Sequence, residues 1–307
     1  LVSETRESLV EYYRVNNLQN YDEVYRAMGF FIGKYGRIDY IESQNEFWLE
    51  LEAKLREDFN IHHGVRPKEL EVMKYKSKMK DVYKKANIPV ARYDYVKTLE
   101  SCIDFANKVG YPIIAKPDNG VGANSTYKLN NEDDIRRFFN ERDESVVYII
   151  EEFIKGHVET FDGIADSNKN VLIASSHVML SSIMDCVNEN QEARFYCQPI
   201  KNRDIETIGK KAVKAFDTRS RFFRLDEDKE GLGKKGDLVG LEVNMRAPGA
   251  YMPDIINYTY DVDVYSIWAD MLIHDKSFVD IDRKYSVGYV SRRDGVKYKN
   301  SIDYVKN

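Results

Sequence analysis

Six residues, Leu241-Glu242-Val243-Asn244-Met245-Arg246, carry the most informative pattern of the chain. Successive side chains of a β-strand point to opposite faces of a sheet, so the three apolar residues face a core and the three polar residues share the other side. Mg²⁺ takes hard oxygen ligands and shares them with phosphates, which suits Glu242 and Asn244. The planar fork of Arg246 suits a phosphate or a carboxylate. The alternative is a solvated strand face without chemistry.

A second segment, residues 113–124, is an apolar strand that ends in Lys116 and continues into a turn with Gly120 and Gly122. Glycine lets backbone N–H groups approach phosphate oxygens closely, and the lysine adds a positive charge at the root of the turn. The segment is not a P-loop, because no Gly-Lys-Ser/Thr follows and the chain is expected to return as a strand. An ordinary hairpin fits it equally well.

A third segment, residues 146–159, is an apolar strand followed by Glu151, Glu152, two apolar residues, Gly156 and Glu159. A chain that leaves a sheet in this way offers backbone C=O and N–H groups to the edge of an adenine ring. Glu159 is placed to accept hydrogen bonds from ribose hydroxyls. Taken alone, the segment also fits a strand end with solvated acidic side chains.

The composition is that of an ordinary globular protein with two or three domains or lobes. The 307 residues are 43% hydrophobic and 32% charged, and no apolar run approaches the roughly 20 residues needed to span a bilayer. A net charge of −5 gives no basic field for nucleic acid or for an anionic membrane surface. Three cysteines without paired spacing and a start without a signal-peptide pattern predict free thiols and a cytoplasmic location.

The periodicity along the chain predicts an α/β protein. In the first 60 residues, a strand at 38–41 between two helices, the second at 45–59, predicts part of an open sheet. A turn with Gly64 and Pro67 marks a boundary, and a long basic helix follows at 69–87. Further strands are expected at 113–116, 125–129, 146–151, 160–165, 171–176, 222–226 and 239–246, helices at 100–109, 132–140, 205–216 and 262–274, a solvated hairpin at 228–237 and another hairpin at 285–298.

The order and spacing of the three segments resemble the ATP-grasp superfamily. Lys116 is followed by Glu151-Glu152-Phe153-Ile154 and then by the Glu-x-Asn-x-Arg pattern that begins at Glu242. The preceding helix adds Lys76-Ser77-Lys78-Met79-Lys80, which looks like the first ATP lysine of that family. The resemblance covers about residues 70–275, and carboxylate–amine ligases are the most similar members.

The resemblance implies an α/β (α+β) ATP-grasp fold with a partial pre-ATP-grasp open-sheet lobe at the N-terminus. That first lobe would comprise residues 1–70 and would be incomplete at its start. Residues 71–307 would form the ATP-grasp region, with a mobile lid lobe at about 91–165 and a C-terminal lobe for metal and ATP at about 166–307.

The resemblance also implies roles for individual residues. Residues expected to bind ATP are Lys76, Lys116, Gly120, Gly122, Ala123, Glu151, Glu152, Ile154 and Glu159; the expected metal ligands are Asp226, Glu242 and Asn244; and Arg246 and Lys116 are the expected catalytic residues. Three departures from the family pattern stand out. Glu159 lies one residue further from Gly156 than usual, Arg224 stands where relatives often have His, and Glu227 competes with Asp226 as the first metal ligand.

The implied activity is an ATP-dependent carboxylate–amine ligase that forms an acyl phosphate and releases ADP and phosphate. Its cofactors would be ATP and Mg²⁺, with Mn²⁺ as an alternative metal. Its partners would be a small-molecule carboxylate and an amine, without nucleic acid or membrane, and a homodimer is allowed. The alternatives are an ATP-grasp enzyme with another acceptor, such as bicarbonate, and a nucleotide-binding module without turnover.

Two other candidate sites have weaker support in the sequence. His177 and His274 lack partners at ligand spacing, which disfavours a zinc site. Arg219 and Arg221 would either grip the carboxylate substrate or form a solvated face.

Overall fold

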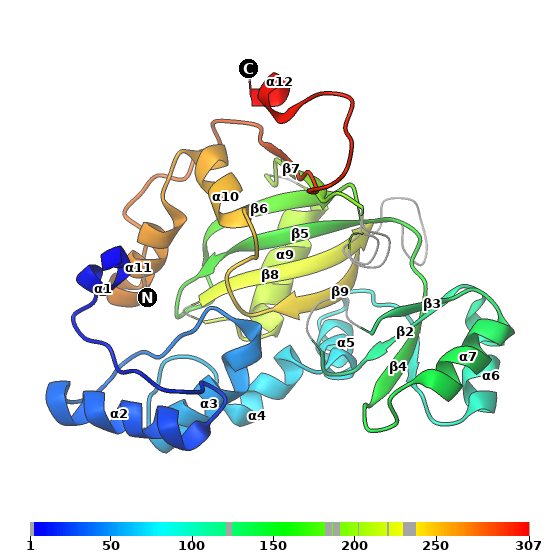
Figure 1. The fold of residues 1–307 in the computed structure, drawn as a ribbon, viewed down its shortest axis with the longest axis horizontal. Coiled ribbons are helices and arrows are strands. Elements are labelled where there is room, and N and C mark those ends of the chain that lie inside the picture. Colours follow the sequence, from blue (N-terminus) through cyan, green and yellow to red (C-terminus); the bar gives the residue numbers. More distant parts are fainter. Residues whose placement is uncertain are drawn as a thin grey trace. The chain divides into compact units, whose positions relative to one another are not determined.

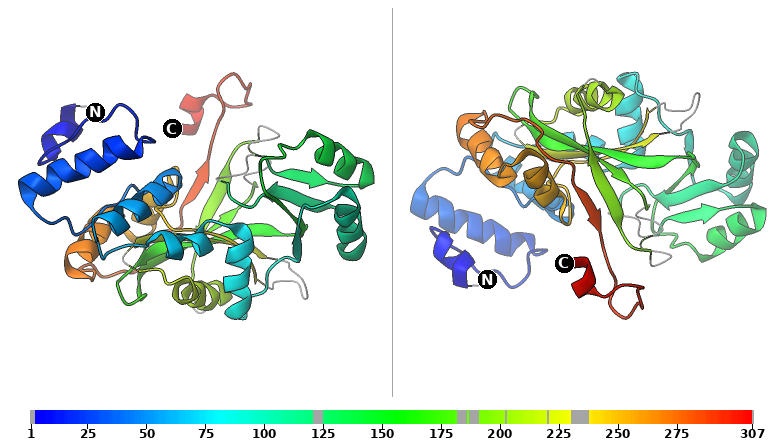
Figure 2. Two further views of the ribbon diagram at one scale, coloured as in Figure 1. Left: turned by 90° about the horizontal axis from the view of Figure 1, so that it is seen from below. Right: turned by 90° about the horizontal axis from the view of Figure 1, so that it is seen from above.

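The structure, a computed structural model, describes residues 3–120, 125–181, 186, 191–201, 203–219, 221–229 and 238–306 (Figure 1). It divides into two compact units, Leu1–Glu71 and Val72–Asn307. Figure 2 shows the same elements from two further sides.

The described part of the first unit is helical. It contains α1 (Ser3–Ser8), α2 (Tyr21–Tyr35), the 3₁₀ turn η1 (Glu46–Trp48), α3 (Leu49–Asp58) and α4 (Pro67–Leu70). The helix α2 begins where the Asn20 side chain accepts hydrogen bonds from two backbone N–H groups, and it ends at Gly36, which has a φ of 83°. Asn45 caps η1 in the same way, so the predicted start at residue 45 is confirmed.

The strand expected at residues 38–41 is absent, and the described residues of the first unit form no sheet. An extended segment needs a neighbouring strand to pair its backbone groups, and the described part of this unit offers none. The carbonyl of Ile41 instead accepts a hydrogen bond from Arg56. The buried Arg56 also donates to the Val65 carbonyl at 3.2 Å and pairs with Glu52 at 3.0 Å, so a guanidinium replaces the expected sheet contacts.

The single long helix expected at 69–87 is also wrong, because the chain forms α4, the 3₁₀ turn η2 (Glu71–Met73) and then α5 (Lys76–Lys85). The break falls at Tyr75, which has an extended backbone and forms an isolated bridge with Asn119. The N–H of Lys76 donates to the Asp118 carbonyl at 2.9 Å instead of to a helix carbonyl. A tertiary contact therefore overrides the local helical pattern.

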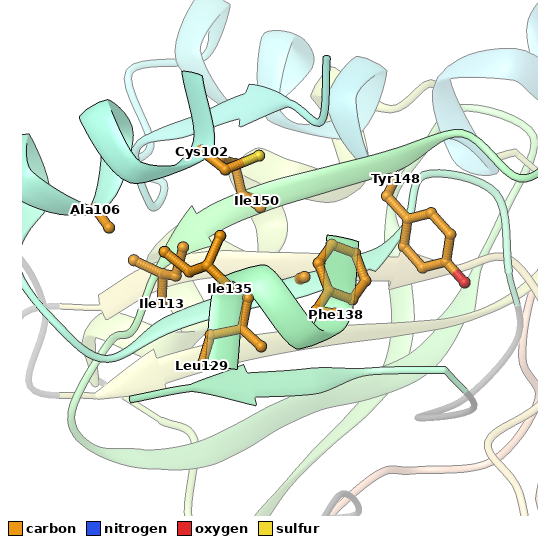
Figure 3. Packing of buried hydrophobic residues seen from close by; sticks show 9 residues of the cluster. Cys102, Ala106, Ile113, Leu129, Ile135, Phe138, Tyr148 and Ile150 are labelled. Carbon is orange, nitrogen blue, oxygen red and sulfur yellow. The ribbon is translucent and has the colours of Figure 1, made fainter. Parts of the chain in front are cut away.

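The second unit contains a four-stranded antiparallel sheet in the order β1-β4-β2-β3. Its strands are β1 (Tyr93–Tyr95), β2 (Ile113–Pro117), β3 (Tyr127–Leu129) and β4 (Tyr148–Glu152). The helices α6 (Leu99–Val109) and α7 (Glu132–Glu141) cover one face, where Ile113, Phe138 and Ile150 are part of a buried apolar cluster (Figure 3). Because strand side chains alternate, Lys116 and Glu151 lie on the opposite face.

The second unit also contains a six-stranded antiparallel sheet in the order β10-β7-β6-β5-β8-β9 (Figure 1). Its strands are β5 (His157–Ala165), β6 (Val171–Met179), β7 (Arg194–Gln198), β8 (Arg221–Lys229), β9 (Leu238–Asn244) and β10 (Gly288–Val290). Phe161 packs on one face against Gly209 of α9 (Asp204–Ala215), where an added Cβ would come within 2.3 Å of the ring. Ile164 packs on the other face with α10 (Met252–Tyr260) and α11 (Val264–His274).

Most of the expected elements of the second unit are present with shifted ends. The strand β7, the helix α10 and the terminal helix α12 (Ile302–Lys306) were not expected. The hairpin expected at 285–298 is wrong, because β10 pairs with β7 and not with the residues that follow it. The strand β8 runs to Lys229, and residues 230–237 of the hairpin expected at 228–237 lie outside the described residues.

Candidate active site

The turn after β2 is held by the first turn of α5. Lys76 Nζ donates to the Gly120 carbonyl at 3.0 Å. The backbone N–H and the hydroxyl of Ser77 each donate to the buried Asp118 carboxylate at 2.8 Å. The structure thus brings together two predicted phosphate-binding positions, Lys76 and Gly120, whereas Gly122 and Ala123 lie outside the described residues.

Lys80, Lys116 and Glu151 form what we call the two-lysine cluster. Glu151 Oε2 lies 2.8 Å from Lys80 Nζ, and Glu151 Oε1 contacts Lys116 Nζ. The register places Glu151 opposite Ile114 and Lys116 opposite Ile149, so both charged residues share the sheet face that α6 and α7 leave uncovered. Both predicted residues, Lys116 and Glu151, are therefore in one place.

The two lysines keep Glu151 ionised. Burial alone would raise the pKa of its carboxyl group, but the charges of Lys116 and Lys80, with their hydrogen bonds, lower the pKa to about 2. The cluster therefore contains one anion and two cations in a buried place. The excess positive charge suits the binding of a further anion, such as a phosphate.

Glu152 is engaged by a neighbouring strand segment. Arg92 donates from its backbone N–H to Glu152 Oε1 at 2.6 Å and from its Nε to Oε2 at 2.7 Å. The backbone N–H of Glu152 donates to the Arg92 carbonyl at 3.0 Å. The side chain thus fixes the end of β4, and Ile154 lies two residues beyond the strand in a half-buried position.

The predicted metal residues meet on two neighbouring strands. Asp226 is opposite Glu242 in the register of β8 and β9, and Arg224 is opposite Asn244. Directly opposite positions of an antiparallel pair share a face, so positions 226, 242 and 244 lie on one face of the sheet. A bulge places Glu227 opposite Gly240, out of step with Glu242. The backbone register thus favours position 226 over position 227.

No group of three His, Cys, Asp or Glu side chains that could hold a metal occurs among the described side chains, a set that does not include Asp226. Magnesium accepts few protein ligands and completes its shell with water and phosphate oxygens. One acidic side chain and one amide on β9, together with position 226 on β8, therefore fit a magnesium site that is completed by a nucleotide.

The strand β9 ends at Asn244, so the prediction that it runs to residue 246 is wrong. Pro248 lacks a backbone N–H and cannot extend the ladder. Val243 and Met245 are buried as expected, but Asn244 is buried as well, with 7% of its surface exposed. Arg246 lies just beyond the strand, half-buried, and donates to the Ala247 carbonyl at 2.9 Å.

Glu159 lies on the other face of the six-stranded sheet. Its neighbour Thr160 is opposite Asp226, and adjacent residues of a strand point to opposite sides. The buried carboxylate pairs with Arg203 at 2.7 Å and accepts a hydrogen bond from Ser176 Oγ at 2.7 Å. One additional residue before a strand moves each of its side chains to the opposite face of the sheet. Glu159 has such an additional residue, because it lies one position further from Gly156 than in the family pattern. The ribose role of Glu159 stays a prediction.

Thr160, Asp162, His177 and Arg224 form a second buried group, which we call the sheet cluster. His177 Nδ1 lies 2.7 Å from Asp162 Oδ2, Thr160 donates to the same carboxylate, and Asp162 is opposite Arg224 in the register. Burial acts to raise the pKa of Asp162, but the charge of Arg224 and the hydrogen bond from His177 outweigh it and lower the pKa.

Two features of these clusters were missed in the sequence. Lys80 could have been found from its spacing, because it lies four residues after Lys76 and therefore on the same side of the helix. The partner of His177 could not, because only the strand register brings Asp162 beside it. Arg221 is buried and donates to the Met245 carbonyl at 3.2 Å, so the solvated-face alternative does not hold for it.

Two other expectations concern the whole chain. The three cysteines are free thiols, as predicted. Among the described residues, no helix combines the length and the apolar character needed to cross a membrane.

Residues 75–218 match the family described as "Carbamoyl-phosphate synthase L chain, ATP binding domain". Mitochondrial carbamoyl-phosphate synthase (ammonia) from Rattus norvegicus is 22% identical over 231 residues, which cover 72% of this chain and 14% of the rat protein. D-alanine–D-alanine ligase B from Clostridium perfringens is 40% identical over 86 residues, which cover 26% of this chain and 28% of that ligase.

The solved structures that are similar over most of the chain include the following two. L-amino acid ligase from Bacillus licheniformis has a TM-score of 0.68 at 16% identity, covering 88% of this chain and 66% of that one. The biotin carboxylase domain of 2-oxoglutarate carboxylase from Hydrogenobacter thermophilus, in complex with MgADP, ADP and bicarbonate, has a TM-score of 0.68 at 18% identity, covering 88% of this chain and 60% of that one. The chain thus spans less than two thirds of the length of each of these four relatives.

Proposed function

The chain has the ATP-grasp fold, and we propose that it is an ATP-dependent carboxylate–amine ligase that works through an acyl phosphate. The observation that carries the proposal is the concentration of cations around the turn after β2. Lys76 contacts that turn and Lys116 stands at its root, beside Lys80 and Glu151. The similarity of residues 75–218 to an ATP-binding domain supports the same location for the nucleotide.

In this proposal, Lys76 and Lys116 bind the phosphates of ATP, and Glu151 with the backbone of Glu152 and Ile154 borders the adenine ring. Asp226, Glu242 and Asn244 hold Mg²⁺, or Mn²⁺ in its place. The metal, when bound, neutralises charge on the outer phosphates. The relatives that are named as ligases support amide-bond formation as the reaction class.

The reaction then needs positioning and electrostatic stabilisation more than a side-chain nucleophile. The substrate carboxylate attacks the γ-phosphorus of ATP, and the bond to ADP breaks. The amine then attacks the acyl carbon, and phosphate leaves with the electron pair. In this proposal Arg246, just after the Glu242 to Asn244 segment, binds the carboxylate or the acyl phosphate, because a planar guanidinium suits either anion.

The experiment is a phosphorus NMR spectrum of the protein turning over ATP and Mg²⁺ with a panel of amino acids, in single and paired combinations. ADP and phosphate are the expected products, together with a new amide. AMP and pyrophosphate as primary products would refute the acyl-phosphate route. The absence of MgATP binding by calorimetry, with folded protein, would refute ATP use altogether.

A second candidate is an enzyme that activates bicarbonate. The match to a carbamoyl-phosphate synthase domain and the bicarbonate in the Hydrogenobacter structure favour it. Bicarbonate-dependent ADP release without any amino acid would support this candidate over the first. For either activity we propose small-molecule partners, a cytoplasmic location that fits the free thiols, and a monomer or homodimer.

A further inference from the structure

Lys80 contributes a buried charge next to the face of the four-stranded sheet that α6 and α7 leave uncovered. Lys76 and Lys80 lie four residues apart on α5, so they project from the same side of the helix. Lys76 reaches the Gly120 carbonyl, and Lys80 reaches Glu151. We propose that Lys80 is a positioning residue that neutralises Glu151 while Lys116 turns from Glu151 to the phosphates of ATP.

The two lysines differ in what they can reach. The Lys80 side chain is fully buried, whereas 9% of the Lys116 side chain is exposed. The Lys80 ammonium lies 5.9 Å from the ring centre of Tyr93 and 2.8 Å from Glu151. Lys116 is therefore the more accessible of the two lysines, and Lys80 is the one enclosed between α5 and the sheet.

The charge balance explains why a second lysine is needed. When Lys116 moves to a phosphate, Glu151 keeps Lys80 as its partner, and the pair left behind is neutral. Without Lys80 the same movement would leave an ionised carboxylate buried and unpaired, which is strongly unfavourable. Lys80 thus lowers the cost of ATP binding without contacting ATP.

The experiment compares ATP with adenosine, because adenosine has no phosphates and gives Lys116 no reason to leave Glu151. Lys80→Met keeps the length of the side chain and removes the charge. We expect it to weaken MgATP binding by roughly 10- to 100-fold in calorimetry and to leave adenosine binding unchanged. The matched control is Lys85→Met, which removes a charge from an exposed position of the same helix and should change neither affinity.

A double-mutant cycle with Glu151→Gln separates this role from the two alternatives. In the Glu151→Gln background, the Lys80→Met substitution should have no further effect on ATP affinity, because no buried anion remains. An equal loss in both backgrounds would mean that Lys80 binds phosphate directly. An equal loss for ATP and adenosine would mean that it only supports the fold. Either result overturns the proposal.

Two outcomes need separate treatment. If Lys80→Met does not fold, the ATP affinities of Glu151→Gln and of the double variant can still be compared, since neither variant leaves an unpaired carboxylate. Equal affinities support the proposal, and a weaker affinity of the double variant refutes it. The proposal rests on ATP binding by this site. If the wild type binds no MgATP, the proposed function fails, whereas ATP binding that is equal in wild type and Lys80→Met refutes only the role of Lys80.

Discussion

Two buried carboxylates, Glu151 and Asp162, have similar partners and different surroundings. Each lies between two basic side chains, and in each the surrounding positive charge outweighs burial and lowers the pKa of the carboxyl group. Lys80 and Lys116, the partners of Glu151, come from a helix and a neighbouring strand. The partners of Asp162 come from the strands on either side of it within one sheet.

This difference shows that the partners of a buried carboxylate can either be free to exchange or be fixed in place by the fold. Lysine has a long, flexible side chain with a compact charge, so it can exchange one anion for another. The pairing of β5 with β6 holds His177 beside Asp162, and Arg224 lies directly opposite Asp162 on β8. Thr160 lies two residues before Asp162 on the same strand. We therefore expect the two-lysine cluster to act in ligand binding and the sheet cluster to act in stability, and the following predictions test that division.

The largest effect is expected at the proposed metal site. This site lies where β8 and β9 pair, on the same sheet face as the sheet cluster. Glu242→Gln combined with Asn244→Ala should reduce ADP release by more than about 1,000-fold, because two proposed metal ligands are removed. The melting temperature should fall only modestly, because Asn244 is buried but neither residue contributes an apolar side chain to the core. Near wild-type ADP release would refute the metal assignment.

At the β5–β6 end of the same face, Asp162→Asn should reduce stability instead. The substitution removes a charge that faces Arg224 and accepts from His177, and breaking a buried pair of this kind costs about 3 to 5 kcal/mol. Urea unfolding measures the loss, and MgATP affinity should be unchanged at temperatures where the variant is folded. Lost ATP binding at unchanged stability would place the sheet cluster in the ligand site.

The free energy of unfolding should depend on pH through the ionisation of Glu151. Its pKa is about 2 in the folded protein and lower than the ordinary value of 4.5, so its contribution is present above about pH 4.5 and is lost as the pH falls toward 2. The contribution amounts to at most about 3 kcal/mol. Urea unfolding of wild type and Glu151→Gln at pH 7 and pH 3 should show the difference between them shrinking in acid. A difference in the free energy of unfolding that is the same at pH 7 and at pH 3 would contradict the stabilisation of ionised Glu151 by the two lysines.

The smallest expected effect concerns the contact of α5 with the strand β9. Tyr83 donates from its hydroxyl to the Glu242 carbonyl at 3.3 Å. Tyr83→Phe removes this bond and keeps the ring, and a typical hydrogen bond contributes about 1 kcal/mol or less. Thermal unfolding should detect a small loss with no change in Mg²⁺ dependence. A large change in Mg²⁺ dependence would show that the hydroxyl positions Glu242 for the metal.

The second unit was predictable to the extent that its motifs are local. Strand alternation predicted that Glu242 and Asn244 share one face of a strand, and the register of β8 and β9 agrees with it. Lys116 and Glu151, both expected to bind ATP from the resemblance, lie in contact, and their roles stay a prediction. The interruption at Tyr75 was not predictable, because it depends on a bridge to Asn119, which is distant in the sequence. The pairing of Asp162 with His177 was hidden for the same reason, since the sequence does not state which strands are neighbours.

The first unit shows the limit of periodicity more clearly. The residues at 38–41 have a strand pattern, but strand formation needs a partner, and the described part of this unit supplies none. The fully buried Arg56 takes over the backbone contact at Ile41, although nothing in its sequence neighbourhood distinguishes it from a surface arginine. A pattern can indicate a preference, whereas the available neighbours determine the outcome.

The helix α5 has a consequence for protein engineering. Its contacts to Gly120, Glu151 and Glu242 come from Lys76, Lys80 and Tyr83, which lie along one stripe of the helix. Deleting or inserting a single residue inside this stretch would rotate the later part by about 100° relative to the earlier part and would separate these side chains from their partners. A chimera that exchanges the four-stranded sheet between related proteins should therefore carry α5 with it and be joined before Tyr75.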